Sequence, residues 1–310
     1  MSGCEVSEDI FEPPPIIERP RTDVMANVLG IGVHAVDMQQ AVAMIQRAVD
    51  DDYKGYVCLA GVHGIMEAHR NRDLRDIYAK AYLVAPDGMP TVWMGHLQGL
   101  SKMQRTFGPD LMLEVIGRRE FAHYKHFLCG GAAGVADELR NELQRRFPWA
   151  TIAGTYAPPF AAMTQLEEAE FGDQIRALRP DIIWVGLSTP KQERFMFRCL
   201  PLLETKLMVG VGAAFLFHTG ALRDSPDWVK RAGLQWAHRL LQEPSRLWRR
   251  YLVNVPLFLL RAALQLTGLR RYHVRREVYA SGTATRAWLA DGLERGIAEQ
   301  EKQLDARGSK

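Results

Sequence analysis

Asp87 is the side chain best placed for acid–base chemistry. It follows the apolar run 81–85 and one proline, in the sequence Ala85-Pro86-Asp87-Gly88. The carboxyl ends of strands in a doubly wound sheet border the ligand crevice, and partial removal from water makes a carboxylate a better proton acceptor. Asp87 is also a candidate N-cap for a helix over 89–95. The two roles are compatible, and Asp87 is the candidate general base.

A second polar group follows the apolar run 182–186. Pro190 suits the first turn of a helix, which would leave nearby backbone N–H groups to hold an anion. Lys191 adds a positive charge, and Gln192 adds an amide that can hydrogen-bond a sugar hydroxyl. An ordinary helix start accounts for these residues equally well. The segment is therefore a candidate contact for phosphate and sugar.

The glycine-rich segment 130–134 is a weaker signal. It resembles a dinucleotide-binding loop, but it lacks the GxGxxG pattern, and no acidic residue stands at the expected distance. His63 and His218 also lie at predicted strand ends. A lone histidine in that position is more often a structural hydrogen-bonding group than a catalyst.

Arg105 and Asp110 lie in a predicted loop that leads into a helix. An arginine in such a loop can grip a diphosphate with two parallel hydrogen bonds. A surface ion pair is the more common role for such a residue. Arg105 is therefore a candidate diphosphate ligand.

Apolar runs alternate with helical patterns along most of the chain. One predicted helix covers 38–49, another begins near residue 65, and a third covers 135–147. The runs are nearly continuous rather than alternating, which is typical of strands buried on both faces. The pattern predicts an α/β fold with a doubly wound, mostly parallel sheet. The predicted strands are 27–33, 55–60, 81–85, 126–129, 151–156, 182–186 and 207–211.

Composition divides the chain into four parts. Residues 1–24 are acidic and proline-rich without the apolar core of a signal peptide, and they are predicted to be a disordered leader. Residues 25–225 form the α/β domain that carries the candidate site, 226–280 a basic helical appendage, and 281–310 a polar tail. The four cysteines are scattered, with no CxxC pair. Cys58 and Cys129 lie in apolar, strand-like runs and are predicted to be buried free thiols in a reducing compartment.

Positive charge is concentrated in the appendage. Residues 223–276 hold twelve Lys or Arg and three acids, a net charge of +9 in a chain whose total is +3. Such a segment favours an anionic partner, which can be phosphate, nucleic acid or a membrane surface. The segment shows no nucleic-acid reader motif and no aromatic residues interleaved on strands. Its charge is therefore assigned to phospholipid and diphosphate, and no nucleic-acid partner is expected.

Within the appendage, residues 250–270 are predicted to form a membrane-surface helix. Its polar positions Asn254, Arg261, Gln265 and Gly268 fall on one narrow stripe. The segment is shorter than the ~20 apolar residues needed to span a bilayer. Packing of the helix on the α/β domain is the alternative. The broad apolar face includes Leu257, Phe258, Leu259, Leu260, Leu264 and Leu266.

From about residue 28 to residue 272, the chain resembles the WecG/TagA/CpsF family of bacterial glycosyltransferases, glycosyltransferase family 26. The resemblance rests on ordered motifs at family-like spacing. These are PDG at 86–88, GLSTPKQE at 186–193, GVGAAF at 210–215, and GLQWAHRL at 233–240 followed by EPSRLWRRY at 243–251.

The resemblance implies an inverting transferase with a Rossmann-like core that needs no metal or other cofactor. Such enzymes use a UDP-sugar donor and an undecaprenyl-diphosphate-linked sugar acceptor. They are cytoplasmic and peripheral on the inner face of the plasma membrane, where they build exopolysaccharide, capsule or cell-wall polymer. Asp87 and Gln192 match the catalytic positions. The expected substrate contacts are His63, Arg105, Gly108, Asp110, Gly130, Lys191, Gly212, Arg239, Arg246, Arg249 and Arg250.

The chain departs from the family pattern at three positions. Leu59-Ala60-Gly61 stands where the family often has Thr-x-Asn, and Leu216 stands where it often has Asp. Lost polar groups would alter donor recognition. Two alternatives therefore stay open: a catalytically impaired member that binds lipid-linked sugars or acts as a scaffold, and an NAD(P)-dependent oxidoreductase. The donor sugar, the acceptor sugar and the oligomeric state, a homo-oligomer included, are not determined.

Overall fold

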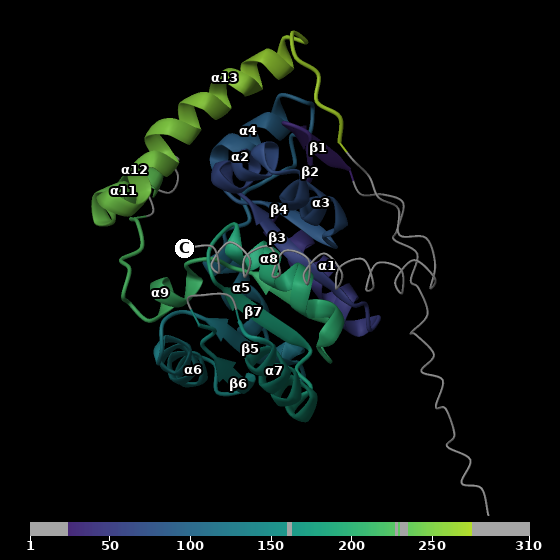
Figure 1. Cartoon of the computed structure of the whole chain (residues 1–310), viewed down its shortest axis with the longest axis vertical. Coiled ribbons are helices and arrows are strands. Elements are labelled where there is room, and N and C mark those ends of the chain that lie inside the picture. The colour runs from purple at the N-terminus through teal and green to yellow at the C-terminus, as the bar shows by residue number, and fades with distance from the viewer. Residues whose placement is uncertain (1–23, 160–162, 227–228, 230–234, 275–310) are drawn as a thin grey trace, which may run out of the picture. The chain divides into compact units, whose positions relative to one another are not determined.

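A computed structural model of the chain describes residues 24–159, 163–226, 229 and 235–274 (Figure 1). These residues belong to one compact unit that spans 22–277. The predicted leader, residue 24 apart, and the predicted tail over 281–310 lie outside the described residues. The boundaries proposed between the four parts stay predictions.

A six-stranded sheet, parallel throughout, forms the centre of the fold. Three of its strands are buried along their whole length, which confirms that near-continuous apolar runs mark strands covered on both faces. The strand order is β4-β3-β8-β7-β5-β6. The strands are β3 (Gly55–Ala60), β4 (Leu83–Pro86), β5 (Lys125–Gly130), β6 (Thr151–Tyr156), β7 (Ile182–Gly186) and β8 (Leu207–Gly210).

The run 27–33 is not a single strand, as predicted, but part of a hairpin. Strands β1 (Met25–Val28) and β2 (Ile31–His34) pair antiparallel in a separate two-stranded sheet. The chain reverses at Leu29 and Gly30, whose φ angles of 53° and 89° are left-handed. The turn was missed because Leu29 is apolar and continues the run. His34 Nδ1 accepts a hydrogen bond from Val84 N–H at 3.0 Å, which covers the edge of β4.

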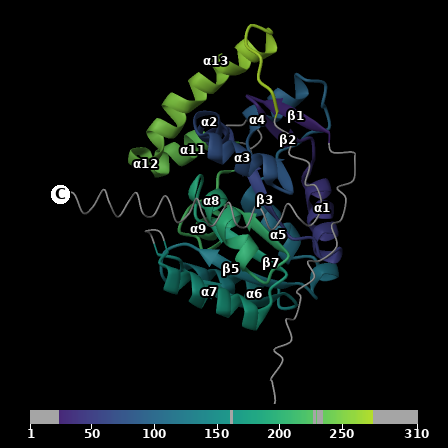
Figure 2. The ribbon, with the colours of Figure 1, turned by 45° about the vertical axis from the view of Figure 1, so that its right-hand side comes forward.

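Helices cover both faces of the sheet (Figures 1 and 2). One apolar core includes residues of α2 (Val62–Arg70), α3 (Arg72–Lys80), α7 (Gln165–Leu178) and α8 (Lys191–Cys199). The other includes residues of α1 (Met38–Asp50), α5 (Gly108–Ile116), α6 (Val135–Arg146) and α9 (Ala214–His218). Helix α4 (Met89–His96) follows β4, and short 3-10 turns occur at Arg119–Phe121 (η1) and Leu200–Leu202 (η2). The predicted doubly wound α/β fold is confirmed.

Residues at its start and along one face account for the first helix. Helix α1 begins with a capping box in which Asp37 and Gln40 bond each other's backbone N–H groups. Its buried face includes the predicted Ala41, Ile45 and Ala48. The predicted helix at 65 begins three residues earlier, at Val62.

The three described cysteines, Cys58, Cys129 and Cys199, are buried free thiols, as expected for the first two.

The described part of the appendage is helical. It comprises α11 (Gln235–Gln242), α12 (Pro244–Trp248), a π-helical turn η3 (Arg249–Val253) and α13 (Asn254–Leu266). Figure 2 shows α13 alongside α2, and Phe258 and Ala262 of α13 belong to the same apolar core as α2. No helix in the described residues is both long and apolar enough to cross a bilayer.

The polar stripe of α13 faces the protein. Asn254 is buried, and Gln265 bonds the hairpin turn through both ends of its amide: Oε1 accepts from Leu29 N–H at 2.9 Å, and Nε2 donates to Asn27 C=O at 2.7 Å. Phe258, predicted on the outer apolar face, is only 1% exposed. The prediction that Phe258 lies on the outer face was wrong. The backbone groups of the hairpin turn need polar partners, so the polar side of α13 faces the protein. Phe258 lies on this inward side of the helix.

Removing the Gln265 amide should loosen α13 from the hairpin. Gln265→Leu leaves Leu29 N–H without its partner and removes one of the two donors to Asn27 C=O, which Gln98 Nε2 still bonds at 3.0 Å. The unpaired N–H should lower the free energy of unfolding by about 1–3 kcal/mol. Amide hydrogen exchange at Leu29 should accelerate. Leu260→Gln, at an exposed position of the same helix, is the matched control and should change stability by less than about 0.5 kcal/mol. Equal stability of the two variants would contradict the docking described.

Candidate functional site

A pocket opens where β3, β4, β7 and β8 end, as the strand-end rule predicts. Its empty volume is about 560 Å³ when the open solvent at its mouth is included. The loops after these strands supply most of its wall. The lining residues are Leu59, Gly61, Gly64, Asp87, Phe107, Gly108, Pro109, Ser188, Thr189, Gln192, Gly210, Val211, Gly212, Ala213, Phe217 and Arg239.

Asp87 lies in this pocket beside Arg105. Its backbone N–H donates to Ala60 C=O at 3.1 Å, which holds the end of β4 against β3. The guanidinium Nε of Arg105 lies 4.0 Å from Asp87 Oδ1, and both side chains are partly exposed. The N-cap of α4 is Gly88, with no side-chain capping bond, so the capping role considered for Asp87 is wrong. With φ at 121°, Gly88 turns the chain before α4, and Asp87 stays at the pocket.

Gln192 is buried and bonded at both ends of its amide. Its Oε1 accepts from Gly212 N–H at 2.9 Å, and its Nε2 donates to Glu193 Oε1 at 3.2 Å. Gln192 and Gly212 both line the pocket, as expected of substrate contacts. The backbone N–H of Gln192 donates to Ser188 C=O, so this N–H of the helix start is not open to an anion, contrary to the prediction for this segment. Lys191 is exposed and is not among the lining residues.

Two phenylalanines lie between two arginines beside the pocket. The Arg105 guanidinium lies 4.3 Å from the centre of the Phe107 ring, which packs edge-on against Phe217 at 5.7 Å. The Arg239 guanidinium lies 5.4 Å from the Phe217 ring. Arg239 comes from α11, and its Nε is buried without a hydrogen-bond partner among the described residues. Both rings and Arg239 line the pocket, whereas Arg105 is not among the lining residues and lies beside Asp87. Two delocalised cations stacked on these rings suit an anionic ligand.

Other predicted contacts lie outside the pocket lining. Asp110 is exposed in the first turn of α5. Gly130 ends β5 with φ at 145°, and a Cβ there would lie 2.7 Å from Gly186 C=O. Glycine is therefore needed at 130 for close strand approach, and the structure gives it no ligand role. The side chains of Arg246, Arg249 and Arg250 lie outside the described residues.

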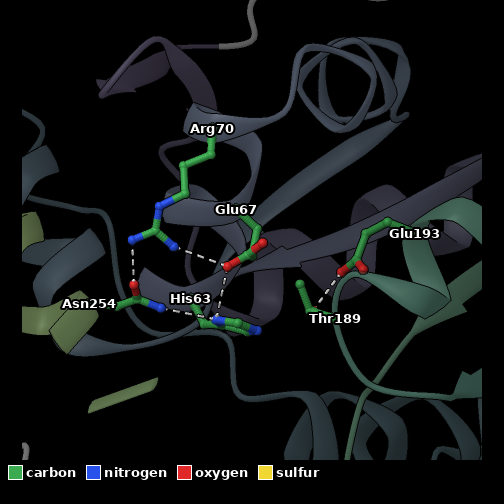
Figure 3. A network of polar contacts seen from close by, with 6 residues as sticks. All are labelled: His63, Glu67, Arg70, Thr189, Glu193 and Asn254. Atoms are coloured by element: carbon green, nitrogen blue, oxygen red, sulfur yellow. Dashed lines mark hydrogen bonds and ion pairs between the residues drawn. The ribbon is translucent and has the colours of Figure 1, made fainter. Parts of the chain in front are cut away.

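His63 lies at the contact between α2 and α13 (Figure 3). Its Nδ1 is 3.3 Å from Asn254 Nδ2 and 4.0 Å from Glu67 Oε1. Arg70 joins the same network, donating to Glu67 at 3.2 Å and to Asn254 Oδ1 at 2.8 Å. His63 lies in the chain between Gly61 and Gly64, which both line the pocket, but it is not itself a lining residue and contacts the appendage.

His218 has a structural role, as its sequence context favours. Its Nε2 lies 3.0 Å from Pro109 C=O, and burial lowers the pKa of the ring below its ordinary value. A neutral ring that donates to a carbonyl at the start of α5 supports the pocket wall. Among the described residues, no three His, Cys, Asp or Glu side chains gather closely enough to hold a metal ion.

Sequence reasoning assigned no role to four residues of the site region. Phe107 and Phe217 support the two arginines, and Thr189 lines the pocket. Glu193 is fully buried behind Gln192. Thr189 and Glu193 both fall in the GLSTPKQE motif, so the signal was present. The aromatic pair has no local signal, because it forms only when α5 and α9 meet.

Two of the three departures from the family pattern lie in the pocket. Leu59 and Gly61 line it, whereas Leu216 on α9 does not. A Cβ on Gly61 would lie 2.8 Å from the carbonyl oxygen of Asp87. A side chain at position 61 would therefore displace the Asp87 backbone and with it the carboxylate of the candidate base.

The family model of the WecG/TagA/CpsF glycosyl transferases matches residues 26–272. This match covers most of the chain and spans every strand of the fold as well as the appendage helices. The protein therefore belongs to the WecG/TagA/CpsF family of glycosyl transferases.

Characterised relatives share one activity by name, N-acetylglucosaminyldiphosphoundecaprenol N-acetyl-beta-D-mannosaminyltransferase. The Bacillus spizizenii protein is 29% identical over 70% of this chain and 82% of its own length. The Bacillus subtilis protein is 28% identical over 62% of this chain and 73% of its own length. The protein of Staphylococcus aureus strain MRSA252 is 24% identical over 80% of this chain and 95% of its own length.

A side chain at position 61 should disturb the base without unfolding the protein. Gly61→Ala places a methyl group against the Asp87 carbonyl, and a shift of about 1 Å at a reacting group can lower turnover as much as 10²-fold. Gly172→Ala, in open space on α7, is the matched control and should keep full glycosyl-transfer activity. The measurement is product formation beside circular dichroism. Equal turnover in the two variants would contradict the coupling.

Proposed function

We propose that this protein is an inverting glycosyltransferase. It moves an N-acetylhexosaminyl group from a UDP-sugar to an undecaprenyl-diphosphate-linked sugar during synthesis of a bacterial surface polysaccharide. The observation that carries the proposal is a pocket lined by one carboxylate, Asp87, and one guanidinium group, Arg239, with a second guanidinium group, Arg105, 4.0 Å from that carboxylate. The names of the relatives support N-acetylmannosamine as the sugar transferred and a lipid-linked N-acetylglucosamine as the acceptor.

Asp87 acts as the general base in this proposal. Its carboxylate takes the proton of the acceptor hydroxyl while that oxygen attacks the anomeric carbon of the donor sugar. The new carbon–oxygen bond forms on the face opposite the departing UDP, which leaves with the electron pair of the broken bond. The configuration at the anomeric carbon is therefore inverted.

Arg105 and Arg239 stabilise the charge that develops on the departing diphosphate. Guanidinium groups bind phosphate oxygens through paired hydrogen bonds, and such bonds strengthen where water is excluded. The aromatic rings of Phe107 and Phe217 limit the freedom of both cations before substrate binds. We infer that these cations take the place of a divalent metal, so transfer should proceed in the presence of EDTA.

The experiment that tests the function is a donor panel. The protein is incubated with UDP-N-acetylmannosamine, UDP-N-acetylglucosamine and UDP-glucose, and with a short-chain lipid diphosphate that carries N-acetylglucosamine, with and without EDTA. One elongated lipid product of inverted configuration, formed equally with EDTA, is expected. Binding of the lipid without turnover of any donor would favour the scaffold alternative, to which Leu59 and Gly61 in the pocket lend support. Oxidation or reduction of a nicotinamide cofactor would favour the oxidoreductase.

Removing the proton acceptor should abolish most of the turnover. Asp87→Asn is nearly isosteric but cannot take a proton, and loss of a general base lowers rates by ~10²–10⁴-fold. Asp110→Asn, an exposed carboxylate outside the pocket lining, is the matched control and should keep its activity. Rates are compared at saturating donor and acceptor. Near-normal turnover in Asp87→Asn would remove Asp87 from the mechanism.

We further infer that the outer face of α13 binds the cytoplasmic leaflet of the plasma membrane. With its polar stripe turned inward, the helix and its flanks leave a row of apolar side chains exposed. Arg270 and Arg271, directly after α13, are exposed as well and suit anionic headgroups. The exposed apolar residues are Leu252, Val253, Leu259, Leu260, Leu266 and Leu269.

Charge on this face should abolish membrane binding. Leu259→Glu with Leu260→Glu places two carboxylates against the lipid, and flotation with anionic vesicles should fall to background. Leu166→Glu with Leu202→Glu, at exposed sites on α7 and η2, is the matched control and should float like the unmodified protein. Binding of the unmodified protein should weaken with salt. Unchanged flotation of the α13 variant would show that the membrane contact lies elsewhere.

A further inference from the structure

Glu193 is a buried carboxylate that the mechanism above does not use. It is 0% exposed. Its Oε1 accepts a hydrogen bond from Thr189 Oγ1 at 2.8 Å (Figure 3). The same oxygen accepts a second hydrogen bond, from Gln192 Nε2, at 3.2 Å. Removing a carboxylate from water costs several kcal/mol. An apolar side chain of similar size at a buried position often stabilises a fold at least as much as a buried charge does. Both of its donors line the pocket. A role in the site accounts for the burial better than stability does.

The hydrogen bonds around Gln192 define a single orientation of its amide. Gly212 N–H can only donate, so it must face the amide oxygen, at 2.9 Å. The Glu193 oxygen on the other side then faces the amide nitrogen. Gly210 leaves the space for this nitrogen, because a Cβ there would lie 3.0 Å from Nε2. The Gln192 amide is therefore held between β8 and Glu193.

The amide nitrogen of Gln192 carries two hydrogens, and Glu193 takes one of them. No described residue accepts the other, and Gln192 lines the pocket. The second N–H is therefore positioned for an oxygen of a bound ligand. Thr189, held by the same Glu193 oxygen, supports the loop that brings Gln192 to this position.

We propose that Glu193 is a positioning residue for sugar transfer. It holds the Gln192 amide so that the second N–H of Nε2 donates to an oxygen of the UDP-sugar donor. The inference rests on the proposed function for the identity of this ligand. Glu193 acts on the reaction through Gln192 and Thr189, its two hydrogen-bond donors.

Two substitutions separate the hydrogen-bond acceptor from the charge. Glu193→Gln keeps a carbonyl oxygen that can accept from both Thr189 and Gln192, whereas Glu193→Leu has similar size and no acceptor. Glu193→Leu should lower kcat/KM for the donor about 10²-fold, as expected for a misplaced contact. Glu193→Gln should stay within a few-fold of the unmodified protein, and KM for the lipid acceptor should not change. Equal losses in the two variants would overturn the proposal.

A double-mutant cycle tests whether Glu193 acts through Gln192. In a Gln192→Ala background, Glu193→Leu should cause no further loss of turnover, because the group that it positions is already gone. A general structural defect would instead lower turnover by the same factor in both backgrounds, and that result would overturn the proposal.

An exchange of the two side chains covers the case in which Glu193→Leu does not fold. Gln192→Glu with Glu193→Gln keeps an acceptor for Gly212 N–H and a hydrogen bond between the pair, but it removes the N–H offered to the donor. This protein should melt like the unmodified one, and its turnover should match that of Gln192→Ala. Full turnover in the exchanged protein would overturn the proposal.

Calorimetric titration with UDP-N-acetylmannosamine separates this inference from the proposed function. Glu193→Leu should weaken binding about tenfold, whereas Glu193→Gln should not. If the unmodified protein binds the donor in this pattern but transfers no sugar, the proposed function fails and the positioning role stands. If it transfers sugar while Glu193→Leu and Glu193→Gln behave alike, the function stands and the positioning role fails.

Discussion

The parallel pairing of β8 with both β3 and β7 is the interaction on which the site depends. It brings the last strand of the sheet between strands that are far apart in sequence, so that segments near residues 61, 87, 190 and 212 end at one place. The hydrogen bond from Gly212 N–H to Gln192 then ties the ends of β8 and β7 together. Asp87, Thr189 and Gln192 take their positions from this arrangement, because each lies in the first residues after a strand or at the start of the helix that follows.

The charged groups of the site differ in their exposure to solvent. Asp87 and Arg105 stay partly open to solvent, where a proton and a substrate can reach them. Glu193 is fully enclosed, where its oxygen can only orient neighbours. Arg239 is the single pocket-lining side chain that the described appendage contributes, and its guanidinium stacks on a ring of the α/β domain. The pocket is therefore completed only when α11 is in place.

The appendage docks with its polar stripe inward, which decides what its outer face can do. Asn254 meets the network of His63, Glu67 and Arg70, and Gln265 meets the hairpin turn. Because these polar groups are satisfied against the protein, leucine side chains are left on the opposite side. The same contacts connect α13 to α2, the helix whose first residues line the pocket. The outer face of α13 and the pocket that Arg239 of α11 lines are thus parts of one connected structure.

The sequence by itself determined the sheet, the order of the motifs and the candidate residues at strand ends. Buried strands need continuous apolar runs, and the glycines and polar residues that follow them are read directly from the chain. It could not determine that 27–33 reverses at Leu29, that Phe258 points inward, or that Gly130 serves strand packing, because each depends on a partner distant in sequence. The tertiary structure alone decided that Phe107 and Phe217 meet between two arginines and that Glu193 lies behind Gln192. Those contacts form only after the sheet brings the loops together, and no local pattern encodes which buried side chain will face which.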